Sequence, residues 1–149
     1  MRDAPQFCDT AHAYTTVDVS EYSYDQLAAD KQIGHGGKPL VGHMKVNTAF
    51  TGAASGVRIY IVDDSVATLA TPRVLAMLCS QAMLGGDTDD LAGVIPITDL
   101  DAIGDHLQAF VPPGIKTQRY LGFKVVPVSE ALATGDVDAW FDDQPEQYE

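Results

Sequence analysis

Two stretches near the C-terminal end of the chain alternate between apolar and polar side chains. The alternating apolar positions are Leu121, Phe123 and Val125 in residues 119–128, and Val137, Ala139 and Phe141 in residues 136–142. Because successive side chains of a β-strand point to opposite faces, a period of two predicts a strand with one buried face. A loop that contains Gly135 is expected between the two stretches. The chain is therefore predicted to end in a β-pair.

Five further segments are strand candidates, and each lies between turn signals. They are residues 14–19, 40–47, 57–63, 94–98 and 106–111. The side chains expected on one buried face are Leu40, Met44 and Val46 in the second segment, and Val57, Ile59 and Ile61 in the third. Proline cannot donate a backbone hydrogen bond, so Pro96 predicts that residues 94–98 lie at a sheet edge.

Two segments do not fit a simple strand pattern. Residues 20–33 form a long connection with room for a helical turn. Residues 73–84 are rich in helix formers, and Thr71 as N-cap with Pro72 at the first helical position would start a helix well. The same apolar run is also typical of a buried strand. Strand is the prediction for residues 73–84, with helix as the alternative.

Turn-forming residues separate the strand candidates. Clusters of Gly, Pro, Ser and Asp occupy residues 34–39, 51–56, 85–90 and 112–114. Repeated short strands with such turns predict an all-β sandwich or barrel. The length of 149 residues and the lack of an internal repeat predict a single domain over residues 1–149. Residues 142–149 are expected to form an acidic, loosely held tail.

The charge balance is strongly acidic. Nine Lys and Arg residues against 21 Asp and Glu residues give a formal net charge of −12. Binding to nucleic acid depends on Lys and Arg side chains that neutralise phosphates, so neither nucleic acid nor an anionic membrane surface is an expected partner. A large net charge also keeps a protein soluble, and that explanation is preferred to a specific cationic partner.

Cysteine spacing and the N-terminal residues suggest a cytoplasmic site of synthesis. Cys8 and Cys79 match no metal-binding or redox spacing, so two buried thiols are the default prediction, with a disulfide as the open alternative. The first residues lack the apolar run of a signal peptide. No segment approaches the roughly 18 apolar residues of a membrane-spanning helix. The protein is expected to be made in a cytoplasm.

Acidic and glycine-rich loops are the first places to look for chemistry. Residues 86–90, with Asp99, Asp101 and Asp105, could supply oxygen ligands to calcium, but they lack the Gly and Glu positions of an EF-hand. A solvated acidic turn is preferred, and calcium binding stays open. Residues 34–38 lack the spacing of a phosphate-binding loop. Ser55 is not in a nucleophile-elbow motif.

Histidines and tyrosines give no local signature of a site. The four histidines are His12, His35, His43 and His106, and they fall on separate predicted elements. Zinc sites can gather such ligands from distant strands, yet ordinary surface or capping roles are preferred. Tyr14, Tyr22 and Tyr24 are either core residues or an exposed aromatic anchor. No enzyme activity, catalytic residue, cofactor or metal is predicted.

Several short motifs, taken in order, resemble one family. They are residues 7–11, 16–19, 33–40, 49–55, 63–64, 95–96, 119–123 and 134–139. Together they resemble the small capsid cement, or decoration, proteins of tailed bacteriophages, of the Bordetella-phage type. The resemblance implies a jelly-roll fold, in which about eight strands form two sheets. The connection at residues 21–31 and the stretch at residues 85–90 depart from the family pattern.

The resemblance also implies a structural function. Such proteins bind the outside of the capsid as symmetric oligomers and reinforce neighbouring major capsid subunits. The expected partners are the major capsid protein and a second copy of this chain, as a homodimer or alternatively a homotrimer. The expected location is the virion exterior. The alternative function is a carbohydrate-binding β-sandwich on a virion or cell surface, with Trp140, Tyr60 and the acidic loops as its binding groups. A metal-dependent cupin-like enzyme is a third class, which the scattered histidines disfavour.

Overall fold

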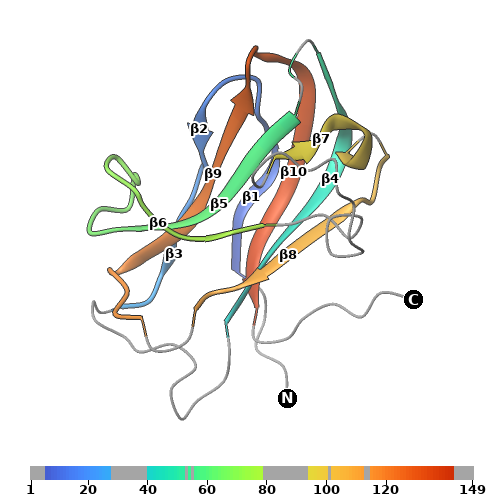
Figure 1. The fold of residues 1–149 in the computed structure, drawn as a ribbon. Helices are drawn as coiled ribbons and strands as arrows, with labels where there is room; N and C mark the ends of the chain where they lie inside the picture. The colour runs from blue at the N-terminus through green and yellow to red at the C-terminus, as the bar shows by residue number, and fades with distance from the viewer. Residues whose placement is uncertain are drawn as a thin grey trace.

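The chain folds into an all-β structure. The computed structural model describes residues 6–27, 40–52, 54, 56–78, 94–100, 102–112 and 115–142. These residues form ten strands and one short 3-10 helix, and none of them lies in an α-helix (Figure 1). The predicted all-β fold class is confirmed, with ten strands in place of about eight.

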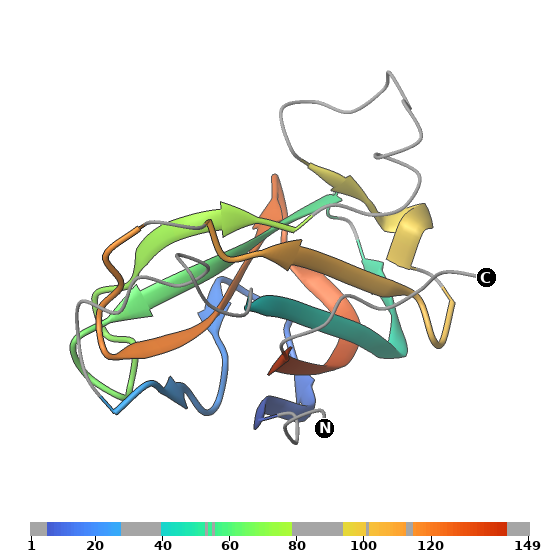
Figure 2. The same cartoon turned by 90° about the horizontal axis from the view of Figure 1, so that it is seen from below.

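The strands form two antiparallel sheets that pack as a jelly-roll-type sandwich. Sheet A has four strands, in the order β1 (Gln6–Ala13), β10 (Leu132–Asp142), β4 (Val41–Gly52) and β8 (His106–Phe110). Sheet B has β2 (Asp18–Val19), β9 (Tyr120–Val128), β5 (Gly56–Asp64) and β6 (Arg73–Met77), with β3 (Tyr24–Asp25) on β9 and β7 (Ile95–Pro96) on β5. The helix η1 (Ile97–Leu100) follows β7. Figure 2 shows β5, β6 and β9 in one layer and β1, β4 and β10 in the other.

The inner faces of the two sheets form the core, and the predicted faces are confirmed. The fully buried side chains include Met44, Val46, Val57, Ile59, Ile61, Leu121, Phe123, Val125, Val137, Ala139 and Phe141. Phe123 of sheet B stacks on Phe141 of sheet A, with ring centroids 4.7 Å apart. Gly42 pairs with Phe141 in sheet A, and a Cβ atom there would come within 2.8 Å of the Ile61 side chain in sheet B. The missing side chain therefore lets the two sheets approach each other.

The predicted terminal β-pair is wrong. β9 pairs with β5, β2 and β3, whereas β10 pairs with β1 and β4, so consecutive strands belong to opposite sheets. Gly135 also lies inside β10 and not in a loop. Its φ is +148°, and a Cβ atom there would overlap the ring of Phe50. A period of two predicts which face is buried, but it carries no information about the partner strand.

Other segment predictions have mixed outcomes. Within residues 14–19 only Asp18–Val19 is strand. The backbone N–H of Tyr14 donates to the Gly135 carbonyl just beyond the end of β1. The strand prediction is confirmed for Arg73–Met77, and residues 79–84 lie outside the described part. The connection at residues 20–33 contains strand β3 and no helical turn in its described part, and residues 28–33 lie outside the described residues.

Two chain positions sit at element boundaries. Asp142 is buried as the last residue of β10, so the expected tail does not begin there, and residues 143–149 lie outside the described part. Pro96 lies in β7, which among the described strands pairs with β5 alone, in accord with the expected edge position.

A buried carboxylate holds the loop between β5 and β6. Asp64 accepts hydrogen bonds from the backbone N–H groups of Thr71 at 2.7 Å and Val66 at 3.2 Å. The loop folds back so that Leu69 covers Gly122 on the outer face of sheet B, where a Cβ atom would collide with the leucine. Burial raises the pKa of Asp64, but the backbone hydrogen bonds outweigh it and hold the pKa below its ordinary value.

Replacing Phe141 tests the core. Phe141→Ala removes a ring that is 1% exposed and stacked between the sheets, so it should lower the free energy of unfolding by about 3–5 kcal/mol. Denaturant unfolding measures this loss. Ile103→Ala is the control, because Ile103 is 79% exposed and should change stability by less than about 0.5 kcal/mol. Equal effects of the two variants would show that the faces of β10 are reversed.

Replacing Asp64 tests the loop anchor through its pH dependence. A carboxyl group with a lowered pKa in the folded state stabilises that state above its unfolded pKa, and the effect is lost as the pH falls through the folded pKa. Asp64→Asn should therefore cost about 1–3 kcal/mol near neutral pH, and the difference should shrink below about pH 4. Urea unfolding of both proteins across this range measures it. A difference that does not change with pH would contradict the role of the charge.

Candidate functional site on the outer face of sheet A

The outer face of sheet A carries a group of aromatic and polar side chains from three strands. Met44 of β4 and Leu107 of β8 point into the core. Because side chains alternate along a strand, the residues on either side of each of them point outward. The register places Trp140 of β10, His43 of β4 and Gln108 of β8 in one row across the sheet. Figure 1 shows β4 between β10 and β8. We call His43, His106 and Trp140 the aromatic cluster.

The three rings of the aromatic cluster pack against one another. The indole of Trp140 stacks on the His43 ring, with centroids 5.2 Å apart and an angle of 13° between the planes. His106 meets His43 edge-on at 5.2 Å and Trp140 at 5.5 Å. His43 is fully buried although it points away from the core, whereas His106 and Trp140 are half-buried. The cluster therefore presents two rings at the surface above a buried one.

A hydrogen bond joins the two histidines. Nδ1 of His43 lies 3.0 Å from Nε2 of His106, and one ring must donate while the other accepts. Both residues are in strands, and the antiparallel register sets His106 opposite Lys45, one diagonal step from His43. The accepting ring must be neutral at that nitrogen, so this contact holds a single proton.

Hydrogen-bonded polar groups surround the aromatic cluster. Asn47 donates its side-chain N–H to Oδ1 of Asp138 at 2.8 Å, and the Thr48 hydroxyl donates to Oδ2 of Asp136 at 2.8 Å. Lys45 is exposed between Asp138 and His106 in the register. We call Lys45, Asn47, Gln108 and Asp138 the polar rim.

The structure brings together two histidines that lie on separate predicted elements. His43 and His106 are 63 residues apart in sequence but lie on neighbouring strands. The prediction of an ordinary surface role is therefore wrong for His43, which is fully buried. His12 lies elsewhere, 3.3 Å from Asp18 at a surface position, and His35 is outside the described residues. No local spacing could have revealed the pair, because the β4–β8 pairing alone creates it.

The three tyrosines divide between the two predicted roles. Tyr14 is fully buried, and its hydroxyl donates to the buried carboxylate of Asp9. Burial is the largest cause of a raised pKa at Asp9, against the hydrogen bonds that the carboxylate accepts. Tyr24 packs against the core, with its ring 5.7 Å from that of Phe141. Tyr22 is 60% exposed and is the only one of the three that could serve as a surface anchor.

The acidic loop and the cysteines were the other candidates. Asp99 and Asp105 are described, whereas Asp101 and residues 86–90 are not. Within the described part of the chain, no group of three or more His, Cys, Asp or Glu side chains gathers in a way that could hold a metal ion. Residues 34–38, Ser55 and Cys79 also lie outside it. Cys8 is a free thiol whose pKa is raised well above its ordinary value by burial and by Asp9, so it stays protonated.

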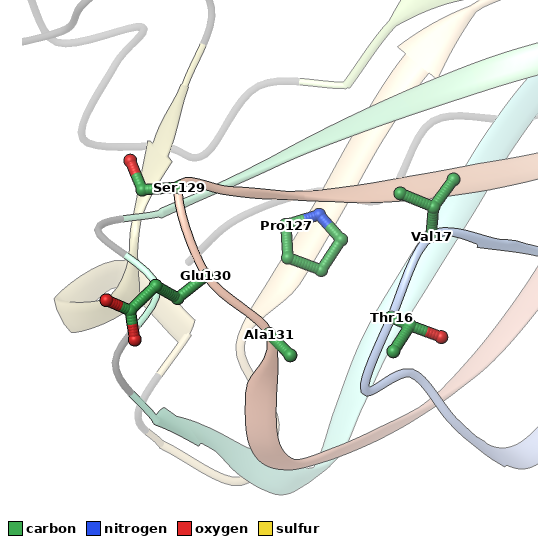
Figure 3. A pocket seen from close by; sticks show the side chains of 6 residues that line it. All are labelled: Thr16, Val17, Pro127, Ser129, Glu130 and Ala131. Atoms are coloured by element: carbon green, nitrogen blue, oxygen red, sulfur yellow. The ribbon is translucent and has the colours of Figure 1, made fainter.

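A shallow pocket lies at the turn between β9 and β10. It has a volume of about 240 Å³ and is lined by Thr16, Val17, Pro127, Ser129, Glu130 and Ala131 (Figure 3). Figure 3 shows the Glu130 carboxylate directed away from Val17 and Pro127. The walls are therefore mainly apolar, and they lie apart from the aromatic cluster in sequence and on the sheets. The pocket offers no convergent set of polar groups from the residues that line it.

Comparison with known proteins assigns the chain to no family. No protein-family model matches it, and no curated protein matches it. Among the described residues, no helix has both the length and the apolar character needed to cross a membrane. The function must therefore be argued from the surface of the molecule itself.

Replacing His106 tests the architecture of the aromatic cluster. His106→Ala leaves the buried Nδ1 of His43 without this partner and should cost about 1–3 kcal/mol of stability. His12→Ala is the control, since it removes a surface contact with Asp18 worth under about 1 kcal/mol. Thermal and urea unfolding measure both, and the emission of Trp140, the single tryptophan, should shift only in His106→Ala. A shift of equal size in both variants would contradict the described packing.

Proposed function

We propose that this protein is a structural virion component that binds the outside of a phage capsid and cements neighbouring major capsid subunits. The observation that carries the proposal is the outer face of sheet A, where the aromatic cluster is surrounded by the polar rim. Protein interfaces combine aromatic residues at their centre with a polar, solvated edge. Residues of this kind at an interface centre supply most of the binding energy.

An exposed aromatic residue extends this surface. Phe110, at the end of β8, is 52% exposed, and alternation places it on the same face as His106 and Gln108. Its ring and the half-buried indole of Trp140 offer apolar area to a partner. Both belong to paired strands of a sandwich, so the surface needs little ordering when it binds.

The capsid is proposed as the partner because of the family resemblance in the sequence. A symmetric oligomer, with a homodimer favoured and a homotrimer possible, would contact more than one capsid subunit and gain by effective concentration. Binding to the assembled shell alone would stabilise that shell by mass action. The net charge of −12 disfavours contact with the packaged genome, in keeping with an exterior position.

Carbohydrate binding is the second candidate, and it would use the same face. Trp140 lies beside the hydrogen-bonding groups of Asp138 and Asn47, a combination that sugar-binding sites require. The indole stacks on His43 and is half-buried, so part of it reaches the surface where a sugar ring could bind. Tyr60 is on β5 of sheet B, between Lys124 and Met77 in the register. Its side chain points outward from sheet B, on the opposite face of the sandwich from Trp140. Tyr60 and Trp140 therefore cannot form one binding platform. A glycan array tests whether the protein binds sugars, and the face that carries Trp140 is the expected site.

A protein inventory of purified particles tests the proposed function. The particles are those encoded by the genome that carries this gene, and mass spectrometry with isotope-labelled standards gives the copy number. We expect a copy number comparable to that of the major capsid protein. Absence from the particles would overturn the capsid proposal and turn attention to carbohydrate binding.

Variants of exposed aromatic residues test which face binds. Purified protein is added to particles that lack it, and binding is measured by co-sedimentation. Phe110→Ser should weaken binding by about tenfold or more if the ring is buried in the contact. Tyr22→Ser is a matched control, because Tyr22 is 60% exposed and follows β2 at sheet B. Loss of binding in Tyr22→Ser alone would place the contact at the β2–β3 connection, beside β1 and away from β8.

A further inference from the structure

We propose that His43 and His106 form a binding site for one divalent transition-metal ion, with Cu²⁺ bound most tightly. The ligands are Nδ1 of His43 and Nε2 of His106, the two nitrogens that face each other across β4 and β8. Imidazole is a ligand that suits Cu²⁺, Ni²⁺ and Zn²⁺. This proposal does not rest on capsid binding, since it needs only these two rings and their supports.

The two nitrogens are close enough for one ion to bind both of them. The two nitrogens are 3.0 Å apart. An ion bound to both at about 2.0–2.1 Å would have an N–metal–N angle of about 94°. Tetragonal Cu²⁺ and square-planar Ni²⁺ place neighbouring ligands about 90° apart. Tetrahedral Zn²⁺ would require nitrogens about 3.3 Å apart. Either ion could bridge the two nitrogens after a small adjustment, and the general affinity order favours Cu²⁺ over Zn²⁺.

The fold holds both rings in place before an ion arrives. Each histidine is on a paired strand, and the register of β4 and β8 fixes the diagonal contact. Trp140 stacks on the His43 ring at an angle of 13° and lies beside His106, so neither ring turns freely. His43 is fully buried, so an ion would enter from the side of the half-buried His106.

Binding requires a change in the proton of the histidine contact. In the present hydrogen bond, one of the two facing nitrogens carries the proton. When the ion binds, that proton moves through solvent to the other nitrogen of the same ring, and two neutral imidazoles coordinate the ion. At lower pH a protonated ring must release its extra proton first, so the affinity for the metal ion decreases as the pH decreases.

Neighbouring charges modulate the site in opposite directions. The register places Lys45 beside His106 and Asp138 beside Lys45. The ammonium group repels a cation, the carboxylate attracts it, and the net charge of −12 raises the cation concentration near the surface. Gln108, in the row of His43, carries no charge. With two protein ligands, water or an external ligand fills the remaining positions, and the affinity is expected to be modest.

A copper titration of the full chain, without an affinity tag, tests the proposal. Trp140 is the single tryptophan and lies against both histidines, so a Cu²⁺ ion there should quench its fluorescence. We expect saturable quenching with one ion per chain and tighter binding of Cu²⁺ than of Zn²⁺. Electron paramagnetic resonance of the Cu²⁺ complex should show coupling to two imidazole nitrogens.

Variants separate this site from other copper ligands. His106→Ala should weaken Cu²⁺ binding by at least about tenfold, and His106→Asn, which keeps a polar group beside His43, is the second variant if the first fails to fold. His12→Ala is the matched control and should bind like the wild type. No saturable quenching in the wild type, or an equal loss in the His12 and His106 variants, would overturn the proposal. Neither result would alter the capsid test, which measures particle copy number.

Discussion

The contact between the inner faces of the two sheets is the interaction on which the rest of the structure depends. Phe123 and Phe141 stack across the interface, and Gly42 leaves the space that lets the sheets come this close. Burial of apolar surface is the main driving force of folding, and a sandwich of this kind buries one face of every long strand. The outer faces are free to carry other side chains only because the inner faces supply this stability.

That constraint explains where the aromatic cluster lies. β10 belongs to sheet A and β9 to sheet B, so the chain crosses between layers at residues 129–131 and delivers Trp140 to the outer face beside β4. β8 completes the face from the other side and brings His106 to His43. The aromatic cluster is thus a product of strand order, and it joins residues from three strands that are distant in sequence.

The same surface supports both proposals, but through different atoms. Capsid binding would use the exposed ring of Phe110, the half-buried indole of Trp140 and the polar rim, whereas metal binding would use the facing nitrogens of His43 and His106. A metal ion at His106 would also fix the indole of Trp140, which stacks on its partner ring. The variants of Phe110 and His106 separate the two proposals.

The sequence by itself determined which side chains are buried, as the positions from Leu121 to Val125 show, and the acidic character of the surface. Alternation is a local property, because each backbone step reverses the direction of the side chain. Only the tertiary structure decided that β9 and β10 lie in opposite sheets and that His43 meets His106. Strand partners depend on the summed packing of residues far apart in the chain, and no local pattern encodes that sum.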